Sequence, residues 1–212
     1  MGTIYLSETA NPLLISYLKA QGHLVQLIRS TRRTYEPVSS HPDIYFCSPG
    51  PGHRLFRGQP DRIGYSYPQN IIYNAACIGK YFIHNLKYTD PELLRCVRDM
   101  RKIHVSQGYT KCNTVVVDEH SIITSDQGIF KACRDHMDVL LIRPHHVKLS
   151  GFPYGFLGGA SGRVENTLLF HGNLKAHPDF GLITDFIRSR GLKLVYFEEF
   201  ELEDIGSILW ES

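Results

Sequence analysis

The sequence predicts an α/β fold in which about five β-β-α-β units close into a ring, because the chain repeats one pattern. Residues 113–117 and 166–170 each begin with Asn-Thr and continue with apolar residues. Each run is followed, after the same eight-residue interval, by Asp-x-Gly and two apolar residues, at 126–130 and 179–183. The two copies align without a gap. One further predicted strand at the C-terminus has no helix after it. A closed ring accounts for it, because this strand can then pair with the N-terminal unit.

The first copy is the clearest unit. Residues 113–117 form a predicted buried strand, and residues 121–124 form its short partner. Asp126 is expected to cap a helix over 127–136, because an Asp side chain accepts hydrogen bonds from the first turn of a helix. Residues 137–142 are apolar and return as the closing strand of the unit.

The second copy predicts the same order of elements. A strand over 166–170 is followed by a shorter partner near 173–176. The next helix is predicted from Pro178 and its cap Asp179 to Arg190. Gly191 ends this helix, and residues 192–197 form the closing strand.

A third unit upstream follows the pattern with more drift. Residues 70–73 are the predicted first strand, and residues 81–83 are its partner. A helix is expected to start at 89–92 and to continue through Val97, because Asp-Pro-Glu is a typical helix N-terminus. Residues 103–105 form the closing strand.

The N-terminal unit consists of a strand at 4–6, a helix from Asn11 through Lys19, and a strand at 23–28. The last strand of the chain, at 208–210, has no helix after it and is expected to pair beside residues 4–6. This pairing closes the ring, with helices on the outside and short mixed sheets facing a central axis.

Residues 29–69 are the least regular part of the chain. They are rich in Pro, Gly, Ser and Arg, and they contain one predicted strand at 43–46. The sequence therefore predicts a degenerate unit without a helix. Residues 1–212 together form one domain.

The composition narrows the class of function. With 212 residues and a formal net charge of +2, the chain gives no electrostatic indication of nucleic-acid or membrane binding. It has no signal-peptide pattern and no apolar run of membrane-spanning length, so a cytoplasmic location is expected. Five cysteines fit a reducing compartment. The sequence has no Cys-x-x-Cys motif, and its histidines are not regularly spaced. It therefore does not predict a metal site, and no cofactor is expected.

Three motifs resemble the pentein superfamily, the α/β-propellers of guanidino-group-modifying enzymes. The repeat unit at 113–128 is similar to the repeat of that fold. Gly158-Gly159-Ala160-Ser161-Gly162 resembles its glycine-rich turn, and Gly108-Tyr109-Thr110-Lys111-Cys112-Asn113 resembles the turn that presents its catalytic cysteine. The resemblance implies a five-bladed propeller whose unit-leading turns meet in an axial pocket.

The resemblance also implies which residues line that pocket. They precede or open the repeated units, or belong to the two turns: Gln69, Asn70, Lys111, Cys112, Asn113, Gly159, Ser161, Glu165 and Asn166. One nucleophile, one carboxylate and several amides suit a small polar or cationic molecule. The asparagines have a structural alternative, because an Asn after a turn can satisfy nearby backbone groups.

Three residues are candidates for catalysis. Cys112 would attack the central carbon of a guanidinium or amidine, with its pKa lowered by Lys111 or a nearby histidine. The alternative is a small buried residue at a strand start. His171 would act as general acid and base, or is a turn histidine bonded to backbone. Glu165 would bind the substrate cation through two hydrogen bonds, or is a solvated turn carboxylate.

Two functions follow from these alternatives. The first is a hydrolase or transferase of a small guanidine or amidine compound that uses Cys112 as nucleophile. The second is a non-catalytic protein of the same fold that binds a small polar ligand or a protein partner. A third and weaker hypothesis is an interaction module built on the aromatic residues Tyr65, Tyr67 and Tyr73. The oligomeric state is not predicted.

Overall fold

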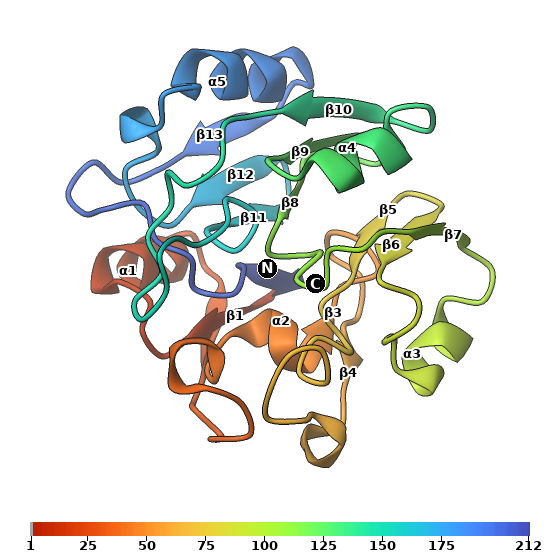
Figure 1. Ribbon diagram of the computed structural model, residues 1–212. Coiled ribbons are helices and arrows are strands. Elements are labelled where there is room, and N and C mark those ends of the chain that lie inside the picture. The colour runs from red at the N-terminus through yellow and green to blue at the C-terminus, as the bar shows by residue number, and fades with distance from the viewer. Residues whose placement is uncertain (1) are drawn as a thin grey trace.

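The computed structural model describes residues 2–212 as a mixed α/β structure with five small sheets (Figure 1). The strands are β1 (Thr3–Ser7), β2 (Leu24–Ile28), β3 (Phe46–Cys47), β4 (Phe56–Arg57), β5 (Ala76–Ile78), β6 (Tyr81–His84), β7 (Arg101–His104), β8 (Thr114–Val116), β9 (Ser121–Thr124), β10 (Asp138–Leu141), β11 (Ser161–Val164), β12 (Thr167–Phe170), β13 (Lys193–Val195) and β14 (Leu209–Glu211). The helices are α1 (Pro12–Ala20), α2 (Pro42–Tyr45), α3 (Pro91–Cys96), α4 (Gln127–Cys133) and α5 (Phe180–Ser189), with 3-10 turns η1 (Glu36–Val38), η2 (Pro60–Arg62) and η3 (Leu174–Ala176).

Three sheets repeat one plan, with a first strand antiparallel to a central strand and a third strand parallel to it. They are β5-β6-β7, β8-β9-β10 and β11-β12-β13. A helix connects the central strand to the parallel third strand in each, as a parallel pair requires. The predicted β-β-α-β unit is therefore confirmed.

The fourth sheet, β14-β1-β2, has the same plan but takes its first strand from the other end of the chain. β14 runs antiparallel to β1 with Ile4 opposite Trp210, and β2 runs parallel to β1 after α1. The predicted pairing of the two terminal segments is confirmed. Both ends of the chain lie near the middle of the molecule in Figure 1, and α1, α3, α4 and α5 lie at its periphery.

The alignment of the two copies is displaced by one strand. β12 is a central strand, so residues 166–170 correspond to β9 at 121–124 and not to residues 113–117. The true counterpart of β8 is β11. First and central strands are both short and apolar here, and hydrophobicity alone does not separate them.

Three predicted strands are wrong. Residues 70–73 form turns that lead into β5, and residues 174–176 form η3. Residues 42–45 form the short helix α2, because Pro42 favours a first helical turn, and only β3 after it is extended. The segment 29–69 is a reduced unit, since its sheet consists of β3 and β4 alone, but the expectation that it lacks a helix is wrong because it contains α2.

The two predicted helix caps differ in outcome. Asp126 caps α4, and its side chain accepts a hydrogen bond from the Ile129 backbone N–H at 2.8 Å. Asp179 precedes α5 without a side-chain cap bond and instead accepts from the Arg143 side chain at 2.7 Å. Gly191 follows α5 with φ +71°, as a helix-ending glycine does.

Neighbouring sheets share buried surfaces. β5 contacts β8, β8 contacts β11, and β11 contacts β14. The reduced sheet joins β5 through Cys47 and Cys77, whose sulfur atoms lie 3.9 Å apart. The apolar clusters lie between these sheets and under the helices, so burial of one unit depends on its neighbours.

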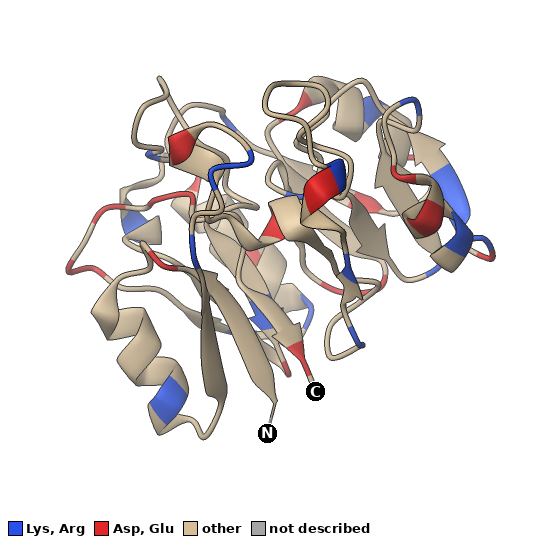
Figure 2. Ribbon diagram, turned by 90° about the horizontal axis from the view of Figure 1, so that it is seen from below, with Lys and Arg blue, Asp and Glu red and all other residues tan. Residues whose placement is uncertain are grey.

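Basic and acidic residues are interspersed over the ribbon in Figure 2. Within residues 2–212, no helix has the length and apolar character that crossing a bilayer requires.

Besides its pairing with β1, the C-terminal strand is held by the side chain of Glu211, which leads to a first prediction. Glu211 accepts hydrogen bonds from the Tyr5 hydroxyl at 3.0 Å, the Leu55 N–H at 3.0 Å and the Arg57 guanidinium at 2.8 Å. Glu211→Ala should lower the free energy of unfolding by about 1–3 kcal/mol, because three donors lose their acceptor. Urea denaturation measures this change.

The matched control is Glu198→Ala. The Glu198 carboxylate pairs with Lys175 at 3.4 Å between two half-exposed side chains. Such a pair contributes about 0–1 kcal/mol. An equal loss in the two variants would contradict the role given to Glu211.

Candidate functional site

The turns that lead into the five sheets are joined by a closed circuit of hydrogen bonds. The Lys111 N–H donates to the Asn74 carbonyl at 3.1 Å, and the Gly159 N–H donates to the Cys112 carbonyl at 2.7 Å. The circuit continues from Ser207 N–H to the Gly159 carbonyl at 2.7 Å, and from Asp43 N–H to the Gly206 carbonyl at 3.2 Å. The Asn74 side-chain amide completes it by donating to the Asp43 carbonyl at 3.3 Å. Segments far apart in the sequence therefore meet at one point.

Four of these positions are structurally equivalent. Asn74, Cys112, Gly159 and Ser207 each stand two residues before the first strand of their sheet, since those strands begin at residues 76, 114, 161 and 209. Asp43 stands three residues before β3, which begins at residue 46. The repeat thus delivers one residue from every unit to the same place.

The glycine-rich turn allows the segments to approach closely. A Cβ atom at Gly158 would lie 2.5 Å from the Cys112 carbonyl oxygen, and one at Gly159 would lie 1.9 Å from Asp204 Oδ1. Both separations are shorter than atoms tolerate, so only glycine fits. The turn therefore serves the assembly of the cluster.

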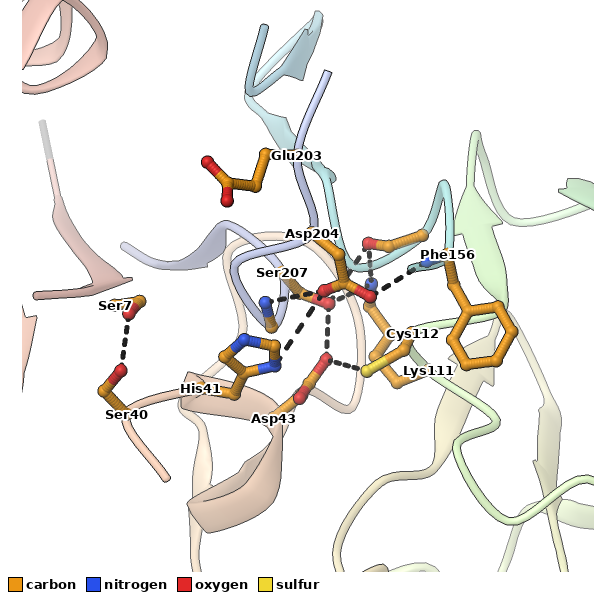
Figure 3. Close-up of polar contacts among 12 residues, drawn as sticks. Ser7, Ser40, His41, Asp43, Lys111, Cys112, Phe156, Glu203, Asp204 and Ser207 are labelled. Atoms are coloured by element: carbon orange, nitrogen blue, oxygen red, sulfur yellow. Dashed lines mark hydrogen bonds and ion pairs between the residues drawn. The ribbon is translucent and has the colours of Figure 1, made fainter. Parts of the chain in front are cut away.

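Cys112 lies at one side of this cluster, with its sulfur against Asp43 (Figure 3). Its thiol donates to Asp43 Oδ2 at 3.0 Å and accepts from the Asn74 amide at 3.3 Å. The same Asp43 oxygen accepts from the Ser207 hydroxyl at 2.7 Å. Lys111 Nζ donates to Ser207 Oγ at 3.0 Å. The Ser207 hydroxyl thus links Lys111 to Asp43, and the Cys112 thiol is bonded directly to the same carboxylate.

Asp204 and His41 form the second half of the cluster. Asp204 accepts from the backbone N–H groups of Phe156 at 3.0 Å and Gly206 at 2.9 Å, and it lies 3.8 Å from His41 Nδ1. Burial and the nearby Asp43 charge raise the pKa of Asp204 to about 7. Burial lowers the pKa of His41 to about 4, although the Asp43 charge partly opposes this. His41 is therefore a neutral imidazole at pH 7.

The thiol of Cys112 is held protonated. Burial raises its pKa well above the ordinary value, and the charges of Asp43 and Asp204 raise it further. Lys111 was expected to lower this pKa. Burial instead lowers the pKa of Lys111 itself, and the charges that add to the effect of burial on the thiol are those of Asp43 and Asp204. The prediction that the pKa of the Cys112 thiol is lowered is therefore wrong.

A cavity of about 230 Å³ opens onto the cluster. His41, Cys112 and Asp204 lie among its lining residues. The rest of the lining is mostly apolar or aromatic: Tyr35, Val38, Tyr109, Leu149, Phe152, Pro153, Tyr154 and Phe156. An apolar cavity with a few convergent polar groups is the usual form of a small-molecule site.

The side chains of His41, Cys112 and Asp204 place ligand atoms within 4.8 Å of one another, close enough to surround a small metal ion. Both carboxylate oxygens of Asp204 already accept a backbone hydrogen bond, and the thiol already donates one to Asp43. Each carboxylate oxygen retains a second acceptor position. These remaining positions could accept hydrogen bonds from a ligand or coordinate an ion.

Several predicted site residues lie in or beside the cluster. Lys111, Cys112 and Gly159 belong to it directly. Ser161 is buried, and its hydroxyl donates to the Gly158 carbonyl at 3.1 Å. Asn113 follows Cys112, but its side-chain oxygen accepts from Thr124 and Ser125, so it holds the central strand.

Other predicted residues lie elsewhere. Asn70 is buried and donates to the hydroxyl of Tyr109, which lines the cavity. Gln69 is exposed in the turn before β5. Glu165 and Asn166 form the exposed tip of the β11–β12 hairpin, as the shifted register dictates.

His171 is buried and accepts a hydrogen bond from the Asn11 N–H at 3.0 Å through Nε2. Its Nδ1 lies 3.0 Å from the Glu203 carbonyl oxygen. Both ring nitrogens are therefore used by backbone groups. His171 is not among the residues that line the cavity at Cys112.

Five residues of the cluster were not found from the sequence: His41, Asp43, Asn74, Asp204 and Ser207. The repeat contained the necessary signal. Asn74 and Ser207 stand two residues before the short apolar strands at 76–78 and 209–211, as Cys112 does before the strand at 114–116. For His41 and Asp43 no signal existed, because the reduced unit carries no recognisable repeat.

The fold and the site define an α/β protein with a buried Cys-His-Asp cluster under an aromatic cavity. The chain belongs to the DUF6873 family, a family of unknown function whose profile matches residues 54–209. Neither a curated protein nor a solved structure matches the chain significantly.

The environment of Cys112 predicts its reactivity. In the ligand-free protein at pH 8, Cys112 should react with iodoacetamide more slowly than the exposed Cys96. Asp43→Asn removes one of the charges that raise the thiol pKa, so Cys112 should then react about tenfold faster for each pKa unit recovered. Peptide mass spectrometry follows each cysteine.

Cys133 is the internal control. Burial alone raises its pKa to about 12, so its rate should not respond to Asp43→Asn. Faster labelling of Cys112 than of Cys96 in the unsubstituted protein would refute this account.

Proposed function

We propose that this chain is a pentein-like protein, a closed five-bladed α/β-propeller, and a hydrolase or transferase of a small guanidine or amidine compound. Cys112 acts as the nucleophile. The observation that carries the proposal is the position of its sulfur, 3.0 Å from Asp43 at the floor of an aromatic cavity, with His41 and Asp204 atoms within 4.8 Å. A nucleophile, a base and paired carboxylates are the groups this reaction needs.

The carboxylates favour a cationic ligand. Asp43 is fully buried, and its Oδ1 has no hydrogen-bond partner among the described residues. A buried acceptor without a donor is costly, so a ligand N–H is its natural partner. Asp204 offers further acceptor positions on the cavity wall. Two carboxylates and several aromatic rings suit a flat cation with N–H groups on both edges.

A bound cation would also place a positive charge beside the two carboxylates. Its positive charge offsets Asp43 and Asp204, which otherwise raise the pKa of the thiol. Binding therefore favours the thiolate just where the electrophilic carbon arrives. In this mechanism the substrate activates the nucleophile, and the free protein keeps the thiol unreactive.

The proposed chemistry has two stages. The thiol proton passes to Asp43, to which it already donates, and the sulfur bonds to the central carbon of the cation. The carbon–nitrogen bond breaks, and the departing amine leaves with that proton. Water, or an acceptor amine in a transferase, then adds to the carbon while neutral His41 accepts its proton. The carbon–sulfur bond breaks, and the sulfur regains a proton.

The second candidate is a non-catalytic protein that binds the same kind of cation. The raised pKa of Cys112 and the burial of its side chain favour this alternative. The two candidates share the binding step and differ only in whether a bond forms to sulfur.

Turnover separates the two candidates. Cys112→Ala should abolish release of ammonia or amine from simple guanidines and amidines, a loss of at least about a thousandfold. The variant should still bind these compounds, because both carboxylates remain. Ammonia release measures turnover, and intact-mass spectrometry of the acid-quenched enzyme detects the adduct on Cys112.

Cys133→Ala is the matched control, since Cys133 is a buried cysteine on α4 outside the cluster. It should leave turnover unchanged. Binding without turnover or adduct in the unsubstituted protein would establish the non-catalytic candidate instead.

The raised pKa of Asp204 makes cation binding depend on pH. Below pH 7 this carboxyl is largely protonated and must lose its proton to face a cation, so binding strengthens as pH rises through about 7. Methylguanidine, which stays charged throughout, should bind about tenfold more weakly at pH 6 than at pH 8. Calorimetry in buffers of different ionisation enthalpy should detect the released proton.

Asp204→Asn provides the comparison for this prediction. An amide does not titrate in this range, so the affinity of the variant should be nearly constant between pH 6 and pH 8. A pH dependence that survives this substitution would assign the titration to another group.

A further inference from the structure

The residues that line the cavity indicate which substituent the ligand carries, whereas the reacting cluster indicates only its cationic head. Among the described residues that line it, none is Lys or Arg. Apart from three tyrosines, the titratable side chains that line it are His41, Cys112 and Asp204, and Asp43 is bonded to the Cys112 sulfur. Lys111 is bonded to the Ser207 hydroxyl and does not line the cavity. An anionic group on a ligand would therefore be buried beside carboxylates without a cation in direct contact, which is unfavourable.

Two of the three tyrosines that line the cavity, Tyr35 and Tyr109, have hydroxyl groups that are already hydrogen-bonded. The Tyr35 hydroxyl accepts from the Tyr67 N–H at 3.1 Å and lies 3.4 Å from the Tyr109 hydroxyl. The Tyr109 hydroxyl also accepts from the Asn70 amide at 2.7 Å. Because these polar ends are engaged with the neighbouring loop, the rings offer apolar surface to the cavity.

The rim of the cavity is unusually apolar for an exposed surface. Phe152 is 41% exposed and Tyr154 is 36% exposed, although both line the cavity. Phe152 packs edge-on against Tyr35 with ring centroids 5.9 Å apart. A ligand that covers these rings would bury surface that otherwise faces water.

The size of the cavity fits a ring joined to a planar cationic head. A cavity of roughly 150 Å³ accommodates benzene. The cavity here measures about 230 Å³, which leaves room for an amidine or guanidine group above Cys112.

We propose that the ligand is an amidine or guanidine with an aromatic or other apolar substituent and without a carboxylate or phosphate. The inference rests on the proposed function for the cationic head, whereas the substituent follows from the walls alone. Amino acids that carry a guanidine group, such as arginine, are poor ligands of this cavity.

Matched probes test the inference with Cys112→Ala, which binds without turnover. Isothermal titration calorimetry compares benzamidine with 4-amidinobenzoate, which adds one carboxylate, and with benzamide, which is neutral. Benzamidine should bind at least about tenfold more tightly than either compound or arginine. Equal or tighter binding of 4-amidinobenzoate or arginine would overturn the inference, as would no detectable binding of benzamidine.

A wall variant checks that the cavity is the binding site. Phe152→Ala should weaken benzamidine binding at least about threefold, because the ring loses apolar contact. Leu182→Ala removes an exposed apolar side chain on α5 and should change nothing. Equal effects of the two variants would overturn the assignment to this cavity.

Turnover by the unsubstituted protein separates this inference from the proposed function. Turnover of arginine that depends on Cys112, with weak benzamidine binding, would remove the inference and leave the proposed function intact. Selective benzamidine binding without turnover of any amidine would remove the proposed enzymatic function and leave the inference about the ligand intact.

Discussion

The structure depends on the circuit of hydrogen bonds that joins the five leading turns. Each turn donates to or accepts from the next, and the Asn74 side chain supplies the link that the backbone does not. Small sheets of two or three strands are not stable alone, so each unit needs its neighbours. The circuit fixes their relative positions and also places Cys112. Folding and assembly of the cluster are therefore one event.

The pattern of units could be predicted from the sequence, and the pairing of the terminal strands followed from it. The error lay in the register of the repeat, because β8 and β12 look alike as short apolar runs. This displacement moved Glu165 and Asn166 into the expected pocket. Asn74 was missed because residues 70–73, and not β5, were predicted as the first strand of their unit. Cys112 was placed in the unit-leading turn because its own unit was read in the right register.

Asp43, His41 and Asp204 could not be predicted because their roles are set by three-dimensional surroundings. His41 and Asp43 lie on either side of Pro42, in a segment whose helix α2 and short β3 follow no repeat. Asp204 sits in a turn that its own side chain stabilises by accepting from Gly206 N–H. In the sequence, each of these three residues resembles an ordinary loop residue. They come together only because the hydrogen-bonded turns bring their segments to one place.

The cluster also explains why buried charge is tolerated at the centre of a small protein. His41, Asp43, Cys112 and Asp204 are each between 0 and 3% exposed. Leaving carboxylates unpaired there costs free energy unless a counter-charge is present. Lys111 reaches them only through the Ser207 hydroxyl, and the imidazole of His41 is neutral. Asp43 and Asp204 therefore lie close together without a direct ion pair to Lys111, and the same arrangement raises the pKa of the Cys112 thiol beside them.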